Sequence, residues 1–165
     1  MVQHLIRNLA PHLIKLRRMS DPNNCILSAQ RSLSLREHSE YEIRTKLRNK
    51  GYAESEINEA VAQLKNADML SDNRYTSQYI RLRQNKGFGK SKIIYELKIK
   101  GISSDMINDN SDVFNDDYDI LVKLYNKKFY KKNENDDKSR SKLYNYFMSR
   151  GFQASHIKKL LEDQG

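Results

Sequence analysis

The stretch Leu47-Arg48-Asn49-Lys50-Gly51-Tyr52 returns fifty positions later as Leu97-Lys98-Ile99-Lys100-Gly101-Ile102, and again as Phe147-Met148-Ser149-Arg150-Gly151-Phe152. Each copy has a base directly before the glycine and a large apolar residue directly after it. Apolar residues also stand eight positions before each glycine, at Ile43, Ile93 and Leu143, and six positions after it, at Ile57, Ile107 and Ile157. Such a fixed period indicates a tandem repeat.

Elementary helix chemistry explains every position of this block. Residues eight and four before the glycine share one face of a helix. The base in the last turn complements the negative helix end, and a C′ glycine adopts the left-handed conformation that closes the helix. A new helix then begins, with expected N-caps at Ser55, Asp105 and Ser155. Each block is therefore a helix, a tight turn and a second helix.

A further helix precedes each block, because apolar residues recur at helical spacing over 24–36, 73–85 and 117–131. Ser39 and Glu42 form the S-x-x-E pattern of a capping box, and Asp72 is the expected N-cap of the helix over 73–85. The sequence thus predicts an all-α fold of three tandem three-helix repeats that form an elongated, curved molecule. The expected repeats are residues 24–67, 71–110 and 116–165.

Between the second and third repeats, the stretch 105–119 contains six aspartates and no base. We expect the last helix of repeat two to be short and this stretch to be a solvated linker. Residues 1–20 form a basic N-terminal arm, either loosely ordered or an extension ahead of a true start at Met19. A targeting or membrane-surface role for the arm is disfavoured, because Pro11 interrupts its apolar pattern.

The composition narrows the function classes. The 165 residues carry 30 lysines and arginines against 21 acids, a formal charge of +9. This balance favours polyanions or acidic protein surfaces as partners. The single cysteine, Cys25, excludes an intrachain disulfide and favours a reducing, cytoplasmic setting. There is no run of 18 apolar residues that would predict a membrane span.

Catalytic and metal-binding patterns are missing from the sequence. The histidines His4, His12, His38 and His156 are scattered and include no helical pair at i, i+4. Gly89-Lys90-Ser91 suggests a phosphate loop, but Gln84 stands where that motif needs its first glycine. We therefore expect no enzyme activity, no cofactor and no metal, and interpret 87–89 as a tight turn anchored by an aromatic residue.

Basic residues are concentrated over 74–100. The predicted partner-binding surface consists of Arg74, Arg81, Arg83, Lys86, Lys90, Lys98 and Lys100. A second basic set contains Arg36, Arg44, Lys46, Arg48 and Lys50, and a third contains Lys123, Lys127, Lys128, Lys131 and Lys132. The alternative interpretation of each set is an ordinary solvated helix face. The glycines Gly51, Gly101 and Gly151 are expected to be structural turn residues.

Several stretches resemble the RecX family. Residues 36–47 (REHSEYEIRTKL) are similar to its pattern R-x-H/Y-S-x-x-E-L/I-R-x-K-L, and 70–76 to L-x-D-x-R-F/Y-A, with Thr76 in place of the usual alanine. Residues 83–89 resemble R-x-x-K-G-x-G, and 96–102 resemble E-L-x-x-K-G-I. The resemblance is densest over 31–107, thins through 110–165 and does not cover 1–19.

This resemblance implies a regulator of the RecA recombinase. The family is understood to bind the RecA–DNA filament in its helical groove and to restrain filament growth, ATP hydrolysis, strand exchange and the co-protease function of the SOS response. Direct DNA contact and a monomeric state are further expectations. Two other classes stay open: a sequence-tolerant DNA-binding module, and a helical adaptor for another acidic protein.

Overall fold

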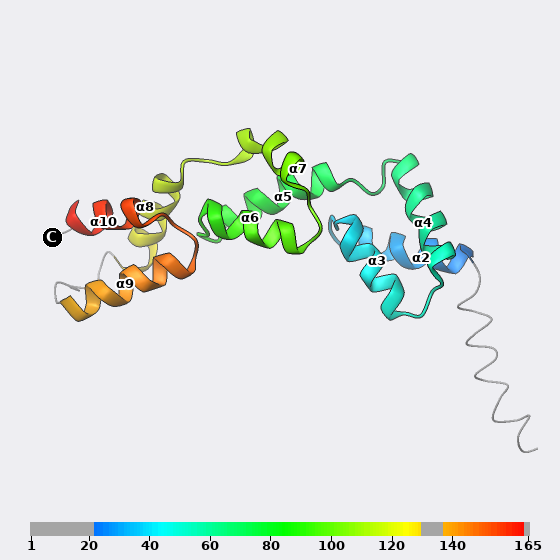
Figure 1. Ribbon diagram of the computed structural model, residues 1–165, viewed down its shortest axis with the longest axis horizontal. Coiled ribbons are helices and arrows are strands. Elements are labelled where there is room, and N and C mark those ends of the chain that lie inside the picture. Colours follow the sequence, from blue (N-terminus) through cyan, green and yellow to red (C-terminus); the bar gives the residue numbers. More distant parts are fainter. Residues whose placement is uncertain (1–21, 130–136, 164–165) are drawn as a thin grey trace, which may run out of the picture. The chain divides into compact units, whose positions relative to one another are not determined.

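The three repeats follow one another as three groups of helices (Figure 1). The computed structural model describes residues 22–129 and 137–163, and within these ranges there are nine α-helices, one short 3-10 helix and no strand. Repeat one contains α2 (Pro22–Leu33), α3 (Glu40–Asn49) and α4 (Glu54–Asn66). Repeat two contains α5 (Asp72–Asn85), α6 (Lys90–Ile99), α7 (Ser104–Asp109) and the 3-10 helix η1 (Ser111–Val113). Repeat three contains α8 (Asp117–Lys128), α9 (Asp137–Ser149) and α10 (Ala154–Asp163). The predicted all-α fold of three tandem three-helix repeats is confirmed.

The repeated glycines end the middle helix of each repeat. Gly51, Gly101 and Gly151 have φ values of 85°, 80° and 85°. In repeat one, the Gly51 N–H donates to the carbonyl of Arg48 at 2.8 Å, and the Tyr52 N–H donates to that of Leu47 at 3.3 Å. The other two repeats have the same pair of bonds. These are the two bonds of a Schellman motif, which requires a left-handed residue at C′.

The aligned apolar positions form the cores of the repeats. The residues eight and four before each glycine, and the isoleucine six after it, are all at most 5% exposed: Ile43, Leu47, Ile57, Ile93, Leu97, Ile107, Leu143, Phe147 and Ile157. Cys25 belongs to the core of repeat one, where burial raises the pKa of its thiol to about 11. Cys25 is therefore an unreactive core residue.

The third helix of each repeat begins earlier than the sequence pattern predicts. Ala53 is the N-cap of α4 and Ser103 is that of α7, whereas Ser55, Asp105 and Ser155 lie inside the first turns of their helices. The predicted caps were wrong, because the residue directly after the Schellman turn already takes the extended conformation of an N-cap, with φ −71° and ψ 151° at Ala53. The Glu56 carboxylate accepts the Ala53 N–H at 2.7 Å.

Other details of the first helices also differ from the expectations. Helix α2 ends at Leu33 and helix α8 at Lys128, each three residues before the expected end. Ser39 caps α3 by accepting the Glu42 N–H at 3.1 Å, as predicted. At α5, the hydroxyl of Ser71 accepts the Arg74 N–H at 3.3 Å, so Asp72 lies inside the helix and is not its N-cap.

The acidic stretch after α7 is anchored, and the prediction of a solvated linker was wrong for part of it. Gln84 of α5 is only 2% exposed. Its side-chain amide forms hydrogen bonds of 3.1–3.2 Å with both the backbone and the side chain of Asn115. Asn110 is buried as well. Long-range amide contacts of this kind leave no local sequence signal. Helix α7 has six residues, which agrees with the expected short helix.

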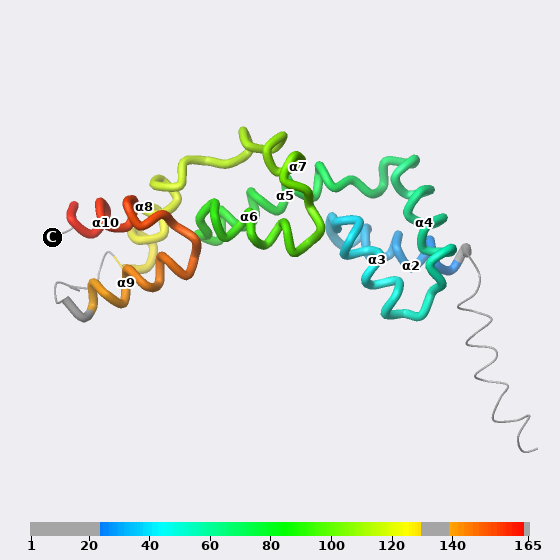
Figure 2. The backbone as a smooth tube through the Cα atoms, viewed as in Figure 1, coloured from blue at the N-terminus to red at the C-terminus, as the bar shows by residue number. Residues whose placement is uncertain are grey.

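The chain divides into two units, residues 1–75 and 76–165, which we call the first and the second unit. Figure 2 traces the backbone from blue through green to red. The first unit contains repeat one and the first turn of α5, and the second unit contains the rest of repeat two with repeat three. The predicted N-terminal arm, residues 1–20, and the basic residues Lys131 and Lys132 lie outside the described residues.

Candidate interaction surface

The predicted basic residues of repeat two lie on two helices and the turn between them. Helix α5 carries the three arginines, the turn carries Lys86, and α6 carries Lys90 and Lys98, with Lys100 at its C-cap. Arg74 belongs to the first unit and the other six belong to the second. Their surroundings divide the set into residues held by carboxylates and residues exposed to solvent.

Arg74 is held inside the first unit. Its guanidinium donates to the Asp68 carboxylate at 2.6 Å, to the Asp68 carbonyl at 2.7 Å and to the Glu37 carboxylate at 3.1 Å. The bonds to Asp68 and Glu37 raise the pKa of Arg74 above its usual value. Asp68 itself has a positive φ of 51°. Arg74 thus ties α5 to the loop before it and to the segment before α3.

Arg83 is held in the same way inside the second unit. Its guanidinium makes two hydrogen bonds to the carboxylate of Glu96 on α6, and the Tyr79 hydroxyl donates to the same carboxylate at 2.9 Å. The guanidinium also lies 3.5 Å from the centre of the Phe88 ring. Both charged side chains are less than one-fifth exposed. Arg83 therefore joins α5 to α6.

Four of the seven predicted residues are exposed: Arg81, Lys86, Lys90 and Lys98. None of these four forms an ion pair with a carboxylate in the part of the chain that the structure describes. The Lys90 ammonium lies 5.2 Å from the Phe114 ring, and that of Lys100, which is half-buried, lies 5.5 Å from the Tyr79 ring. The exposed four, together with Lys100, form the candidate interaction surface.

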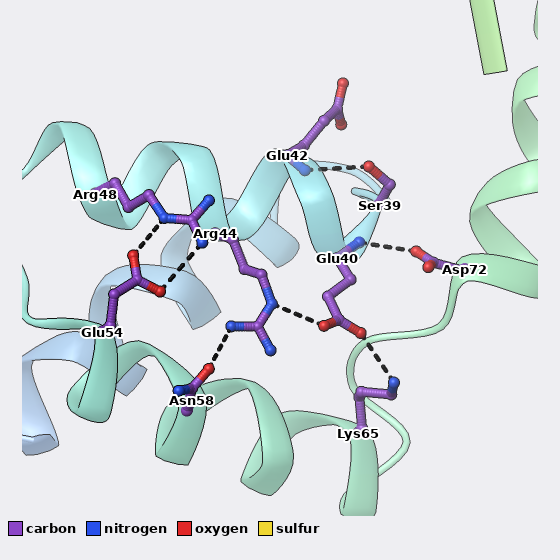
Figure 3. A network of polar contacts seen from close by, with 9 residues as sticks. All are labelled: Ser39, Glu40, Glu42, Arg44, Arg48, Glu54, Asn58, Lys65 and Asp72. Carbon is purple, nitrogen blue, oxygen red and sulfur yellow. Dashed lines mark hydrogen bonds and ion pairs between the residues drawn. The ribbon is translucent and has the colours of Figure 1, made fainter. Parts of the chain in front are cut away.

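The side chains of the basic set of repeat one are bonded within the fold, and Figure 3 shows two of them, Arg44 and Arg48, with their partners. Arg44 donates to Glu40 and to Asn58, both at 2.7 Å, and Arg48 pairs with Glu54. The remaining members of this set bond as follows: Arg36 to Glu42, Lys46 to His38 and Lys50 to Ser28. Lys65 donates to Glu40 at 2.9 Å. Burial opposes ionisation of Glu40, but the bonds from Lys65 and Arg44 outweigh it and hold its pKa below the usual value.

Two aspartates that the charge pattern did not single out connect successive repeats. Asp72, in the first turn of α5, accepts the Glu40 N–H at the start of α3 at 2.8 Å. Asp117, in the first turn of α8, accepts the Lys90 N–H at the start of α6, also at 2.8 Å. Burial raises the pKa of both carboxyls. Their positions, 45 residues apart at the start of a repeat, were the available sequence signal.

His38 is another residue whose role the sequence did not reveal. Its side chain is 1% exposed, with Nδ1 3.0 Å from the Arg36 carbonyl and Nε2 2.7 Å from the Lys46 ammonium. An ammonium can only donate, so Nε2 accepts and the ring is neutral, with its proton on Nδ1. Burial lowers the pKa of His38, which agrees with this tautomer.

The turn 87–89 packs against the last of the three glycine turns. Gly87 has a φ of 73°, and the Gly89 N–H donates to the Arg150 carbonyl at 2.9 Å. The Arg150 guanidinium donates hydrogen bonds to the carbonyls of Lys86 and Gly87 at 3.0 and 3.1 Å, and it lies 4.6 Å from the centre of the Phe88 ring. Phe88 anchors this turn, and the structure offers no phosphate loop here, because a helix precedes it.

The described residues include no cluster of three histidine, cysteine or carboxylate side chains placed to hold a metal ion. No helix in the described part of the chain has the length and apolar character needed to cross a membrane.

Comparisons with known proteins agree with the repeat architecture. Family models of the first, second and third three-helix domains of RecX match residues 25–64, 71–109 and 115–161. Regulatory protein RecX of Haemophilus influenzae strain PittEE is 36% identical over 134 residues, covering 78% of this chain and 87% of its own. The protein of the same name from Mannheimia succiniciproducens is 36% identical over 124 residues, covering 73% and 80%.

Solved structures give the same fold. The crystal structure of RecX from Lactobacillus salivarius matches with a TM-score of 0.71 and 22% identity, covering 86% of this chain and 95% of its own. A crystal structure of a regulatory protein RecX matches with a TM-score of 0.67 and 21% identity, covering 86% and 73%. The three matched domains and the identity to relatives over most of the chain show that this protein belongs to the RecX family.

Proposed function

We propose that the protein binds the RecA–DNA filament in the cytoplasm and restrains its recombinase, ATPase and co-protease activities in DNA repair and the SOS response. The observation that carries the proposal is the group of exposed basic side chains on repeat two, which no carboxylate of the described residues neutralises. Unpaired surface cations attract acidic protein surfaces and DNA phosphates. Linked repeats add further weak contacts at high effective concentration.

Regulation by binding needs no catalytic group. A protein that favours one state of a filament shifts its population by the difference between its affinities for the two states. Occupying a groove also blocks other partners sterically. Arg74 and Arg83 contribute indirectly in this proposal, because their guanidinium groups hold the helices that carry the exposed residues.

The experiment is inhibition of RecA ATPase on single-stranded DNA by the full chain and by the double variant Arg81→Glu/Lys90→Glu. Both residues are exposed, and Lys90 is the first residue of α6, where a negative charge suits the helix dipole. We expect the inhibitory concentration to rise about tenfold with unchanged helicity.

The matched control is Lys142→Glu/Lys158→Glu, which changes the net charge equally at two exposed positions outside the proposed surface. This variant should inhibit like the parent. Equal loss of inhibition in both variants would show that net charge alone causes the effect. No loss in either variant would refute the proposal that Arg81 and Lys90 contact the filament.

The alternative function is sequence-tolerant DNA binding, which the same exposed cations favour. Binding to bare single- and double-stranded DNA should be compared with binding to RecA-coated DNA at several salt concentrations. Our proposal predicts tighter binding to the coated DNA. Equal or tighter binding to bare DNA, with a steep salt dependence, would favour the alternative.

A further inference from the structure

The second unit contains a cleft of about 500 Å³ between the C-terminal end of α5 and helix α8. One wall is the segment 84–87 and the other is formed by residues from 115 to 128. Hydrogen bonds between the side-chain amide of Gln84 and the backbone and side chain of Asn115 fix the two walls at one end. The volume is within the range of ligand-binding clefts and accommodates a few residues of an extended peptide.

Lysines gather around this cleft. Lys123 and Lys127 lie one helical turn apart on α8, and Lys86 comes from the opposite wall. All three are exposed, and none forms an ion pair with a carboxylate among the residues that the structure describes. Lys128, also at the cleft, donates to the Tyr146 hydroxyl at 3.1 Å. Four lysines therefore line the cleft against two aspartates, Asp116 and Asp119, which leaves an excess of positive charge.

The cleft also has aliphatic lining. Ile120 and Leu124 of α8 contribute to it and are 7% and 6% exposed. The turn lies directly against α8, since a Cβ added at Gly87 would stand 2.8 Å from Cδ1 of Leu124. The site thus combines aliphatic lining with lysine side chains.

Two features of the lining favour a peptide over a nucleic acid. Among the residues that the structure describes, no aromatic side chain lines the cleft, whereas single strands are bound by stacking bases on aromatic rings. Asp116 and Asp119 line one end, and Asp119 is exposed, so an uninterrupted row of phosphates would meet like charges there. A peptide can space its carboxylates to meet the lysines and place an aliphatic side chain between them.

We propose that this cleft binds an acidic, leucine-containing segment of a partner protein, with its carboxylates on Lys86, Lys123 and Lys127 and an aliphatic side chain against Leu124. Lys86 belongs both to this cleft and to the candidate interaction surface, whereas Arg81, Lys90 and Lys98 do not line the cleft. The inference does not depend on the proposed filament binding, because its test contains neither recombinase nor filament and varies Lys123 and Lys127, which lie outside that surface.

The test is fluorescence anisotropy of a labelled peptide in which glutamate and aspartate alternate with leucine, titrated with the full chain. We expect Lys123→Glu/Lys127→Glu to weaken binding at least about tenfold, and the charge-matched Lys142→Glu/Lys158→Glu to change it by less than about twofold. All four lysines are exposed, so thermal melts should match the parent. A peptide with glutamine and asparagine in place of the acids should bind at least about tenfold more weakly.

Three results would overturn the inference. Equal weakening in both double variants would assign the binding to net charge. Equal affinity for the peptide with glutamine and asparagine would show that the carboxylates do not contribute to binding. Displacement of the labelled peptide by oligothymidine at lower concentration than by unlabelled peptide would assign the cleft to nucleic acid.

Discussion

The two units of the molecule use their basic residues differently. Six of the seven ion pairs found among the described residues lie in the first unit. There, Arg36, Arg44, Arg48, Lys65 and Arg74 all meet carboxylates. In the second unit the described pair is Arg83 with Glu96, and Arg81, Lys86, Lys98, Lys123 and Lys127 are exposed without one. Repeats of the same fold thus have basic side chains paired with carboxylates in the first unit and exposed, unpaired lysines and arginines in the described part of the second.

Net charge alone is therefore a weak guide to an interaction site. Repeat one has a basic set as dense as that of repeat two, yet its charges are engaged within the fold. Surface ion pairs contribute little stability individually, since solvent screens them. In repeat one these ion pairs neutralise the basic side chains, so repeat two and α8 are left as the candidate contact regions.

The largest expected effect is a loss of stability on substituting a turn glycine, and it should differ between Gly51 in the first unit and Gly151 in the second. Gly51 and Gly151 both have φ near 85°, but a Cβ at Gly151 would also overlap the backbone nitrogen of Lys92. Gly51→Ala should lower the free energy of unfolding by about 1 kcal/mol, from backbone strain alone. Gly151→Ala should lower it by about 3 kcal/mol, because overpacking against α6 is added. Urea unfolding of both variants measures the two free energies of unfolding. Equal losses would contradict the close packing of Gly151 against Lys92 of α6.

A smaller difference is expected between two glutamates that bind cations. Glu96→Gln removes the carboxylate from Arg83, which is only 18% exposed, and should lower stability by about 1–3 kcal/mol. Glu40→Gln acts on Arg44 and on Lys65, which is 57% exposed, so solvent replaces part of the contact and the loss should stay below about 1 kcal/mol.

Hydrogen exchange resolved by residue distinguishes these two variants, because each should raise exchange mainly in its own unit. A larger loss in Glu40→Gln than in Glu96→Gln would show that the ion pairs of the first unit contribute more than their exposure implies.

The smallest effect is a pH dependence confined to the first unit. The pKa of buried His38 is lowered from 6.5 in the folded state, so the unfolded chain binds the proton more readily. The stability from neutral His38 is fully present above pH 6.5 and is lost as the pH falls through the lower folded value. Thermal melts from neutral to mildly acidic pH should show this loss, and His38→Gln should reduce it. An unchanged slope in His38→Gln would contradict the neutral ring.

The sequence predicted the repeats well, because helix closure is local. A glycine at C′, apolar residues four and eight positions earlier and an isoleucine six later describe one supersecondary unit within fifteen residues. The N-caps at Ser55, Asp105 and Ser155 were wrong because the Schellman turn itself sets the next helix start, whichever residue stands there. At Ala53 a side chain without any polar atom occupies the cap position.

The candidate binding residues were harder to predict than the fold. Arg83 and Glu96 are thirteen residues apart and Arg74 and Glu37 are thirty-seven apart, so their pairing depends on how the helices pack. The sequence pattern therefore grouped Arg74 and Arg83 with Arg81 and Lys90, although the first two bind carboxylates within the fold. Likewise, no local signal marks His38 as buried or Lys46 as its partner.

The difference between the two units is tested most directly by comparing the salt dependence of binding to RecA-coated DNA for two variants. Arg44→Gln/Arg48→Gln removes two cations that the first unit holds in ion pairs, and Arg81→Gln/Lys90→Gln removes two exposed cations of the second unit. We expect weaker binding and a shallower dependence of log affinity on log salt for the second pair, and parental values for the first. Equal changes in the two variants, or a change in the first alone, would contradict this expectation.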